Sequence, residues 1–151
     1  MFAENNLFFH FEKCLGTRAQ LAVSYALLDA SGKTLRQEGY RSQNYMPMAS
    51  VVKIPIALLV LRRIFDDHAF RLDTKIDIRN EDFVPGAPWN SLDRYFFYPW
   101  SIQKQKTVDE LLTHMLSESD NTAADILLRL VGGTMAVNEF IHELGFKEFR
   151  H

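Results

Sequence analysis

The spacing of hydrophobic residues near the N-terminus predicts an amphipathic helix. Leu7, Phe8, Phe11 and Leu15 recur at intervals of three or four residues, so they fall on one helical face. Gly16 follows, and glycine commonly ends a helix. The first element is therefore expected to be a helix that ends near Gly16.

Two short stretches after this helix predict a β-hairpin. Residues 20–28 are rich in Leu, Val and Tyr, and residues 33–40 alternate with polar positions. Asp-Ala-Ser-Gly at 29–32 has the composition of a turn. An isolated two-stranded hairpin is marginal in water, so it needs further strands or a covering helix.

The rest of the chain predicts mainly helices. Residues 50–66 carry Ile, Leu and Val at every angle around a helix, which favours a helix buried on all sides. Residues 72–105 are irregular and hold four loop-marking residues, Pro85, Gly86, Pro88 and Pro99.

Signals for the start and the end of helices divide the remaining third of the chain. Thr107 and Glu110 form a capping box, and glycines at 132–133 end the helices of this region after Leu130. A further helix is expected over residues 134–145. The order is helix, two strands, buried helix, long loop region and several helices.

Composition narrows the class of protein without indicating its chemistry. Seventeen basic and nineteen acidic residues give a net charge of −2, which offers no footprint for nucleic acid or an anionic membrane. The longest apolar run, residues 54–61, is too short to span a bilayer. Cys14 is the only cysteine, so an internal disulfide is excluded. No signal peptide is visible in residues 1–6.

The first candidate for chemistry is Ser50 with Lys53. A spacing of three residues puts the hydroxyl and the amine on one face at a helix start. A partly desolvated lysine can take the proton of a serine, which is otherwise a weak nucleophile. A second pair, Ser101 and Lys104, lies in a polar stretch and is interpreted as solvated surface. The apolar helix after Lys53 favours the first pair.

The second candidate is Ser119-Asp120-Asn121. All three residue types are good helix N-caps, so a purely structural interpretation is open for this tripeptide alone. Its position before a second apolar helix fits either a cap or a site.

Taken together, the two motifs resemble those of class A serine β-lactamases. MPMASVVK at residues 46–53 resembles the nucleophile segment of that family, and residues 117–128 resemble its second motif and the helix after it. Residues 107–111 resemble the helix start before this motif. The likeness continues through residues 130–133 and 138–146.

The resemblance runs from about residue 8 to the end of the chain and implies a fold. The expected class is α/β, β-lactamase/transpeptidase-like, with an antiparallel sheet flanked by helices plus an all-helical domain. Residues 1–49 would supply the N-terminal helix and the first two strands of the α/β domain. Residues 50–151 would supply the nucleophile helix and most of the all-helical domain. The C-terminal part of the α/β domain would be absent, so the fold is expected to be incomplete in this chain.

The resemblance also implies roles for individual residues. Ser50 corresponds to the nucleophile that forms the acyl-enzyme, its backbone N–H to half of the oxyanion hole, and Lys53 to the amine that activates it. Ser119 corresponds to the hydroxyl that passes a proton to the leaving nitrogen, and Asn121 to a side chain that binds the substrate amide. Asp120 is expected to cap and brace the loop behind them.

Two local departures from the family pattern stand out. Asp125 occupies a position where many class A enzymes have Asn, a residue that supports the loop carrying the deacylating Glu. Asp here is similar to a branch that hydrolyses extended-spectrum cephalosporins. The region 88–107 is longer than usual and rich in aromatic residues, which either pack the loop or, in the case of Trp89, flank the site mouth. Its other aromatic residues are Tyr95, Phe96, Phe97, Tyr98 and Trp100.

The third departure concerns motifs that do not occur in the sequence. Neither Glu-x-x-Leu-Asn, which carries the deacylating Glu, nor Lys-Thr-Gly is present. A chain with only the acylating half of the site is expected to stall as an acyl-enzyme. It is also expected to fold poorly alone, or to pair with a missing C-terminal segment or another copy.

Two alternatives to hydrolysis of β-lactams stay open. One is a penicillin-binding D,D-peptidase, although Thr-Ala-Ala at 122–124 favours a lactamase. The other is a truncated product that binds β-lactams without hydrolysing them. The histidines show no ligand spacing, so we expect no metal and no cofactor. The expected partner is a small β-lactam, and the resemblance implies a periplasmic or secreted protein whose signal peptide has been removed.

Overall fold

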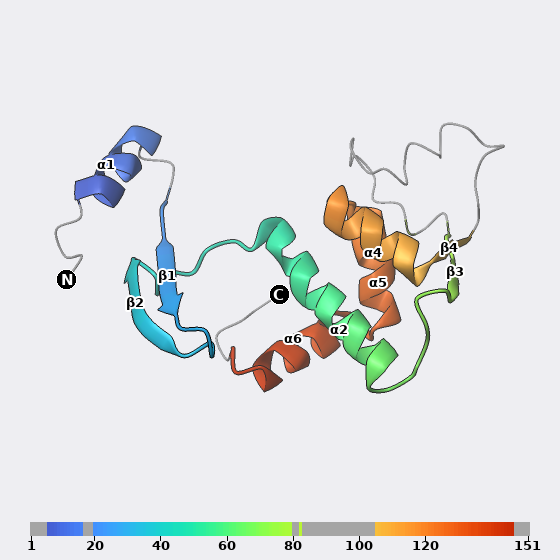
Figure 1. The fold of residues 1–151 in the computed structure, drawn as a ribbon. Helices are drawn as coiled ribbons and strands as arrows, with labels where there is room; N and C mark the ends of the chain where they lie inside the picture. The colour runs from blue at the N-terminus through green and yellow to red at the C-terminus, as the bar shows by residue number, and fades with distance from the viewer. Residues whose placement is uncertain (1–5, 17–19, 80–81, 83–104, 147–151) are drawn as a thin grey trace. The chain divides into compact units, whose positions relative to one another are not determined.

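A computed structural model describes residues 6–16, 20–79, 82 and 105–146. It divides into two compact units, Met1–Pro47 and Met48–His151. The fold is mixed α/β, as predicted. Its elements in chain order (Figure 1) are α1 Asn6–Leu15, β1 Val23–Leu28, β2 Thr34–Tyr40, the 3-10 turn η1 Ala49–Val52, α2 Lys53–Phe65, β3 Lys75–Asp77, β4 Gln105–Thr107, α4 Val108–Ser117, α5 Asn121–Leu130 and α6 Gly133–Glu143.

The first unit is built on the predicted hairpin. Strands β1 and β2 pair antiparallel from Val23 opposite Tyr40 onward, with an irregularity between Leu27 and Leu28. The turn forms because a carboxylate oxygen of Asp29 accepts the backbone N–H groups of Ser31 and Lys33, both at 2.9 Å.

Helix α1 is joined to the end of β2 by aromatic and polar contacts. The rings of Phe8 and Tyr40 stack with centroids 5.8 Å apart. The Tyr40 hydroxyl donates to the Glu12 carboxylate at 2.9 Å, and Arg41 forms an ion pair with the same group. The predicted helix and hairpin are therefore both confirmed, and the helix packs on the hairpin.

The second unit is a cluster of helices in which α2 packs against α4, α5 and α6. Figure 1 shows α2 in green beside the orange and red helices. All four helices contribute side chains to the core. These side chains are buried because each helix turns one apolar face inward. The fully inaccessible hydrophobic residues are Val60, Val108, Leu111, Met115, Ala123, Leu127 and Val137.

Helix α2 differs from its prediction in two respects. Ser50 lies in the 3-10 turn η1, so the α-helix begins only at Lys53, and Pro55 occupies its first turn as expected. The helix is also not buried on all sides. Ile54 is 54% and Leu58 46% exposed, because the neighbouring helices cover only the opposite face.

Two short strands appear in the region predicted to be irregular. Strands β3 and β4 pair antiparallel, with Lys75 opposite Thr107 and Asp77 opposite Gln105. Three-residue strands carry too little alternation to be recognised in sequence, and their partners are far apart in the chain. Their pairing brings residues 75–77 beside residues 105–107, which lead directly into α4.

The capping box predicted at the start of α4 is confirmed. The Thr107 hydroxyl accepts the Glu110 N–H at 3.1 Å, and the Glu110 carboxylate accepts the Thr107 N–H at 2.9 Å. The later helices also end close to their predictions: α5 stops at Leu130, and α6 begins after Gly132, whose φ of 107° suits glycine.

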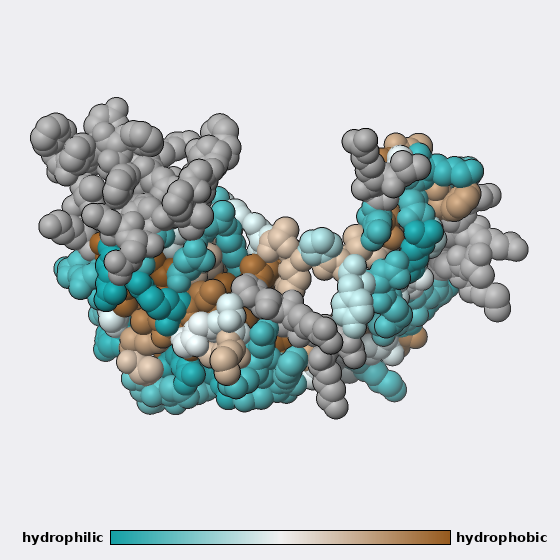
Figure 2. Space-filling view, turned by 180° about the vertical axis from the view of Figure 1, so that it is seen from behind, coloured by the Kyte–Doolittle hydropathy of each residue, from teal (hydrophilic) through white to brown (hydrophobic). Residues whose placement is uncertain are grey.

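On the face drawn in Figure 2, the described residues include both hydrophilic and hydrophobic ones, intermingled at the surface. Among the described residues, no helix combines the length and the apolar character that crossing a bilayer requires. The same residues contain no group of three or more His, Cys, Asp or Glu side chains arranged to hold a metal ion.

Candidate active site

Ser50 is presented by the tight turn that leads into α2. The Val51 N–H donates to the Met48 carbonyl at 2.9 Å, and the N–H of Lys53 reaches the carbonyl oxygens of Ser50 and Val51. Ala49, directly before Ser50, has a left-handed φ of 45°, which is uncommon for a residue other than glycine. The turn therefore holds the Ser50 side chain directly before the N-terminal end of α2.

Ser119, Asp120 and Asn121 form the turn between α4 and α5. Asp120 is 1% exposed, and its carboxylate accepts the Ala123 N–H at 2.8 Å, so it is the N-cap of α5 as predicted. Its own N–H donates to the His114 carbonyl at 3.2 Å. Ser119 has a left-handed φ of 56°. Asp120 is thus held through both its side chain and its backbone N–H, while Ser119 and Asn121 on either side of it are exposed.

The Lys53 amine brings the two motifs together. Lys53 is only 5% exposed, and its Nζ lies 3.5 Å from Ser50 Oγ, 2.9 Å from Ser119 Oγ and 2.7 Å from Asn121 Oδ1. It also donates to the Ser119 carbonyl. The two serine hydroxyls contact each other at 2.9 Å. Contacts between residues 66 to 69 positions apart thus join the two motifs into one cluster.

The hydrogen bonds of Lys53 are compatible with both the charged ammonium and the neutral amine. An ammonium has three N–H bonds, whereas a neutral amine has two and a lone pair. The Ser119 carbonyl and Asn121 Oδ1 can only accept, so they occupy two N–H bonds in either state. The remaining position faces the hydroxyls of Ser50 and Ser119, which can both donate and accept. The amine can therefore gain or lose a proton without losing its two fixed acceptors.

Burial favours the neutral form of the Lys53 amine over the charged form. Desolvation lowers the pKa of Lys53 below its ordinary value of 10.5, and the carboxylates of Asp120 and Asp125 partly oppose this shift. A lysine with a lowered pKa beside a serine hydroxyl is an arrangement that can activate the oxygen for attack on a carbonyl carbon.

The chain as a whole is similar to a known protein family. The family described as "Beta-lactamase enzyme family" matches residues 13–151. The chain belongs to this family. Among curated relatives, it is 36% identical over 104 residues to β-lactamase VEB-1 of Pseudomonas aeruginosa, covering 69% of this chain and 33% of the relative. It is 30% identical over 127 residues to a β-lactamase of Bacteroides uniformis, covering 84% of this chain and 40% of the relative.

Solved structures give the same assignment and specify class A. An ancestral class A β-lactamase (GNCA) is 30% identical and matches with a TM-score of 0.75, over 95% of this chain and 49% of its own. A β-lactamase of Burkholderia vietnamiensis matches with the same score at 27% identity, over 96% and 49% of the two chains. The chain thus spans about half the length of these structures and between a third and two fifths of the curated relatives. The peptidase alternative is not favoured.

The structure brings together four of the residues singled out in the sequence, Ser50, Lys53, Ser119 and Asn121. Asp125 is exposed on α5, one turn beyond Asn121. Trp89 and the second Ser-Lys pair at 101–104 lie outside the described residues. The sequence did not indicate the carbonyl of Ser119 as a partner of Lys53, since no residue type marks a backbone acceptor.

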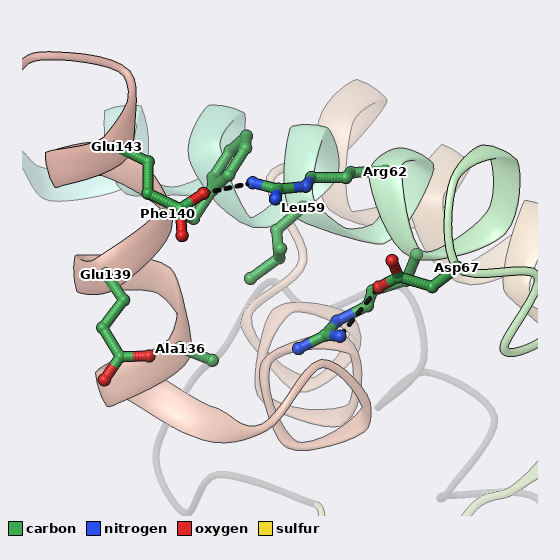
Figure 3. A pocket seen from close by; sticks show the side chains of 8 residues that line it. Leu59, Arg62, Asp67, Ala136, Glu139, Phe140 and Glu143 are labelled. Carbon is green, nitrogen blue, oxygen red and sulfur yellow. Dashed lines mark hydrogen bonds and ion pairs between the residues drawn. The ribbon is translucent and has the colours of Figure 1, made fainter.

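A pocket lies between α2 and α6, and none of the residues that line it belongs to the cluster around Lys53 (Figure 3). Its walls are held by two ion pairs, Arg62 with Glu143 at 2.5 Å and Arg63 with Asp67 at 2.7 Å. The Arg62 guanidinium also lies over the Phe140 ring, 5.5 Å from its centroid. The contacts of Arg62 with Glu143 and Phe140 join α2 to α6, whereas Arg63 and Asp67 are only four residues apart in the chain.

Proposed function

We propose that this chain carries the acylating part of a class A serine β-lactamase, with Ser50 as the nucleophile. The observation that carries the proposal is the connected cluster of Ser50, Lys53 and Ser119 around one buried amine. The substrate is a small β-lactam, since membership of the family supports this class of compound. We further propose a periplasmic or secreted location, which fractionation of the source cells would test.

In the proposed reaction, neutral Lys53 takes the proton of Ser50 as Oγ attacks the lactam carbonyl carbon. The backbone N–H of Ser50, at the N-terminal end of α2, stabilises the negative charge on the carbonyl oxygen. As the ring C–N bond breaks, Ser119 Oγ gives its proton to the leaving nitrogen and recovers one from the Lys53 ammonium. Asn121 binds the amide of the substrate side chain. The amine ends neutral, and the product is an ester on Ser50.

Hydrolysis of that ester requires a base that activates water. The sequence holds no Glu-x-x-Leu-Asn motif, so we infer that the 151-residue chain by itself stops at the acyl-enzyme. A long-lived adduct on Ser50 is therefore expected.

The direct test is labelling with a fluorescent penicillin followed by intact mass measurement. The wild-type chain should gain one penicillin, mapped to Ser50 by peptide analysis. Ser50→Ala should lose the label, and Ser101→Ala is the matched control because Ser101 begins the other Ser-x-x-Lys sequence. Labelling that persists in folded Ser50→Ala, or that disappears in Ser101→Ala instead, would overturn the assignment.

A further inference from the structure

A single left-handed residue interrupts a right-handed stretch of backbone directly before Ser50. Met48 has φ −73° and ψ −27°, and Lys53, at the start of α2, has φ −66° and ψ −25°, so both are right-handed. Ala49 between them has a φ of 45°. This region costs energy for residues other than glycine, and an alanine side chain has no polar atom that could bind its own backbone in compensation. The conformation of Ala49 is therefore imposed by the fold and is not a preference of the residue.

The left-handed conformation of Ala49 determines what surrounds the backbone N–H of Ser50. If a right-handed run continued backwards through Ala49, a carbonyl oxygen of residues 46–47 would accept this N–H, since helices bond residues three or four positions apart. The turn instead begins one residue later, where the Val51 N–H donates to the Met48 carbonyl at 2.9 Å. Within the described part of the chain, no backbone carbonyl accepts the Ser50 N–H. The break at Ala49 therefore keeps this N–H available, and both residues are exposed.

We propose that Ala49 is a positioning residue of the Ser50 site, whose left-handed backbone keeps the Ser50 N–H available for the carbonyl oxygen of the substrate. The inference rests on the proposed function. As the bond from Ser50 Oγ to the lactam carbon forms, the electron pair of the C=O π bond moves to the oxygen, which becomes negative. A free and fixed donor stabilises this charge, whereas a donor already bound to a protein carbonyl does not. The conformational cost at Ala49 is offset by the bond from Val51 to Met48 and by the 2.9 Å contact of Ser50 Oγ with Ser119 Oγ.

The test compares Ala49→Asn with Ala49→Thr, two polar side chains of similar size. Asparagine adopts the left-handed conformation readily, whereas β-branched threonine strongly disfavours it. The maximal rate of labelling by fluorescent penicillin should fall about tenfold in Ala49→Thr, with little change in the half-saturating concentration, and Ala49→Asn should keep at least half of the wild-type rate. Hydrogen exchange of the Ser50 amide, followed by NMR without any β-lactam, should slow about tenfold in Ala49→Thr alone, because the N–H gains a carbonyl partner.

His68 provides the matched control, because it has a left-handed φ of 49° just beyond the other end of α2. His68→Thr should lower the melting temperature but leave the labelling rate and the Ser50 amide unchanged. The proposal is wrong if folded Ala49→Thr labels at the wild-type rate, if its Ser50 amide exchanges as in Ala49→Asn, or if His68→Thr slows labelling equally.

Two further measurements cover the cases in which labelling by Ala49→Thr is not informative. If Ala49→Thr fails to fold, Ala49→Gly decides, because glycine takes up the left-handed conformation more readily than alanine. Slower labelling in Ala49→Gly would then overturn the role of Ala49, and labelling at least as fast as in the wild type would support it. If the wild-type chain never labels but its Ser50 amide exchange slows only in Ala49→Thr, the proposed function fails and the role of Ala49 in keeping this N–H free stands.

Discussion

Replacing Asp120 with Ala should destabilise the helical unit, because this one side chain anchors the turn before α5. Asp120 is 1% exposed and accepts the N–H of Ala123, which is fully buried. Loss of an N-cap costs about 0.5–2 kcal/mol, and an unsatisfied buried N–H costs about 1–3 kcal/mol. The two ranges describe the same lost bond, so we expect a loss of about 2 kcal/mol. For a unit of this size, that corresponds to a fall in melting temperature of roughly 8 °C.

The measurement is urea and thermal unfolding of the full chain, with two comparison variants. Asp120→Asn keeps an acceptor oxygen and should recover most of the stability. Thr107→Ala removes the corresponding cap of α4, whose partner N–H on Glu110 is less deeply buried, and should lose about 1 kcal/mol. If Asp120→Asn lost as much stability as Asp120→Ala, the acceptor would not be the source of the effect. A loss in Asp120→Ala no larger than that in Thr107→Ala would equally contradict the reasoning from burial.

Two further predictions concern the core and the pH dependence. Leu127→Ala should cost about 3 kcal/mol in urea unfolding, because Leu127 is fully buried, whereas Leu116→Ala at a 54% exposed position should change stability by about 0.5 kcal/mol or less. Because the pKa of Lys53 is lowered below 10.5, the unfolded chain binds more protons between that lowered pKa and 10.5, so stability should rise with pH across this window. The rate of penicillin labelling should also rise as the pH passes through the lowered pKa. If Lys53→Met showed the same dependence of stability on pH as the wild type, Lys53 would not be the source of that dependence.

The local elements could be predicted from sequence wherever short-range chemistry decides them. The capping box at Thr107, the N-cap at Asp120 and the turn at Asp29 each depend on side chains within a few residues of the backbone groups they bind. The pairing of β3 with β4 could not be predicted, because it joins residues about thirty positions apart through strands of three residues. The exposed face of α2 was mispredicted for a related reason: periodicity reports how apolar a face is, and not whether a neighbour covers it.

The candidate site shows the same division within a few residues. The spacing of Ser50 and Lys53 on a helix start is a local property, and it correctly puts them on one side of the chain. The contact of Lys53 with Ser119 depends instead on the left-handed backbone of Ser119, a conformation that serine rarely adopts by its own preference. That conformation is compatible with a folded chain because Asp120 is bound on both sides of the turn and because Lys53 satisfies the carbonyl and the hydroxyl of Ser119. The geometry of the site and the packing of α5 on α2 therefore depend on each other, and neither follows from the two motifs taken separately.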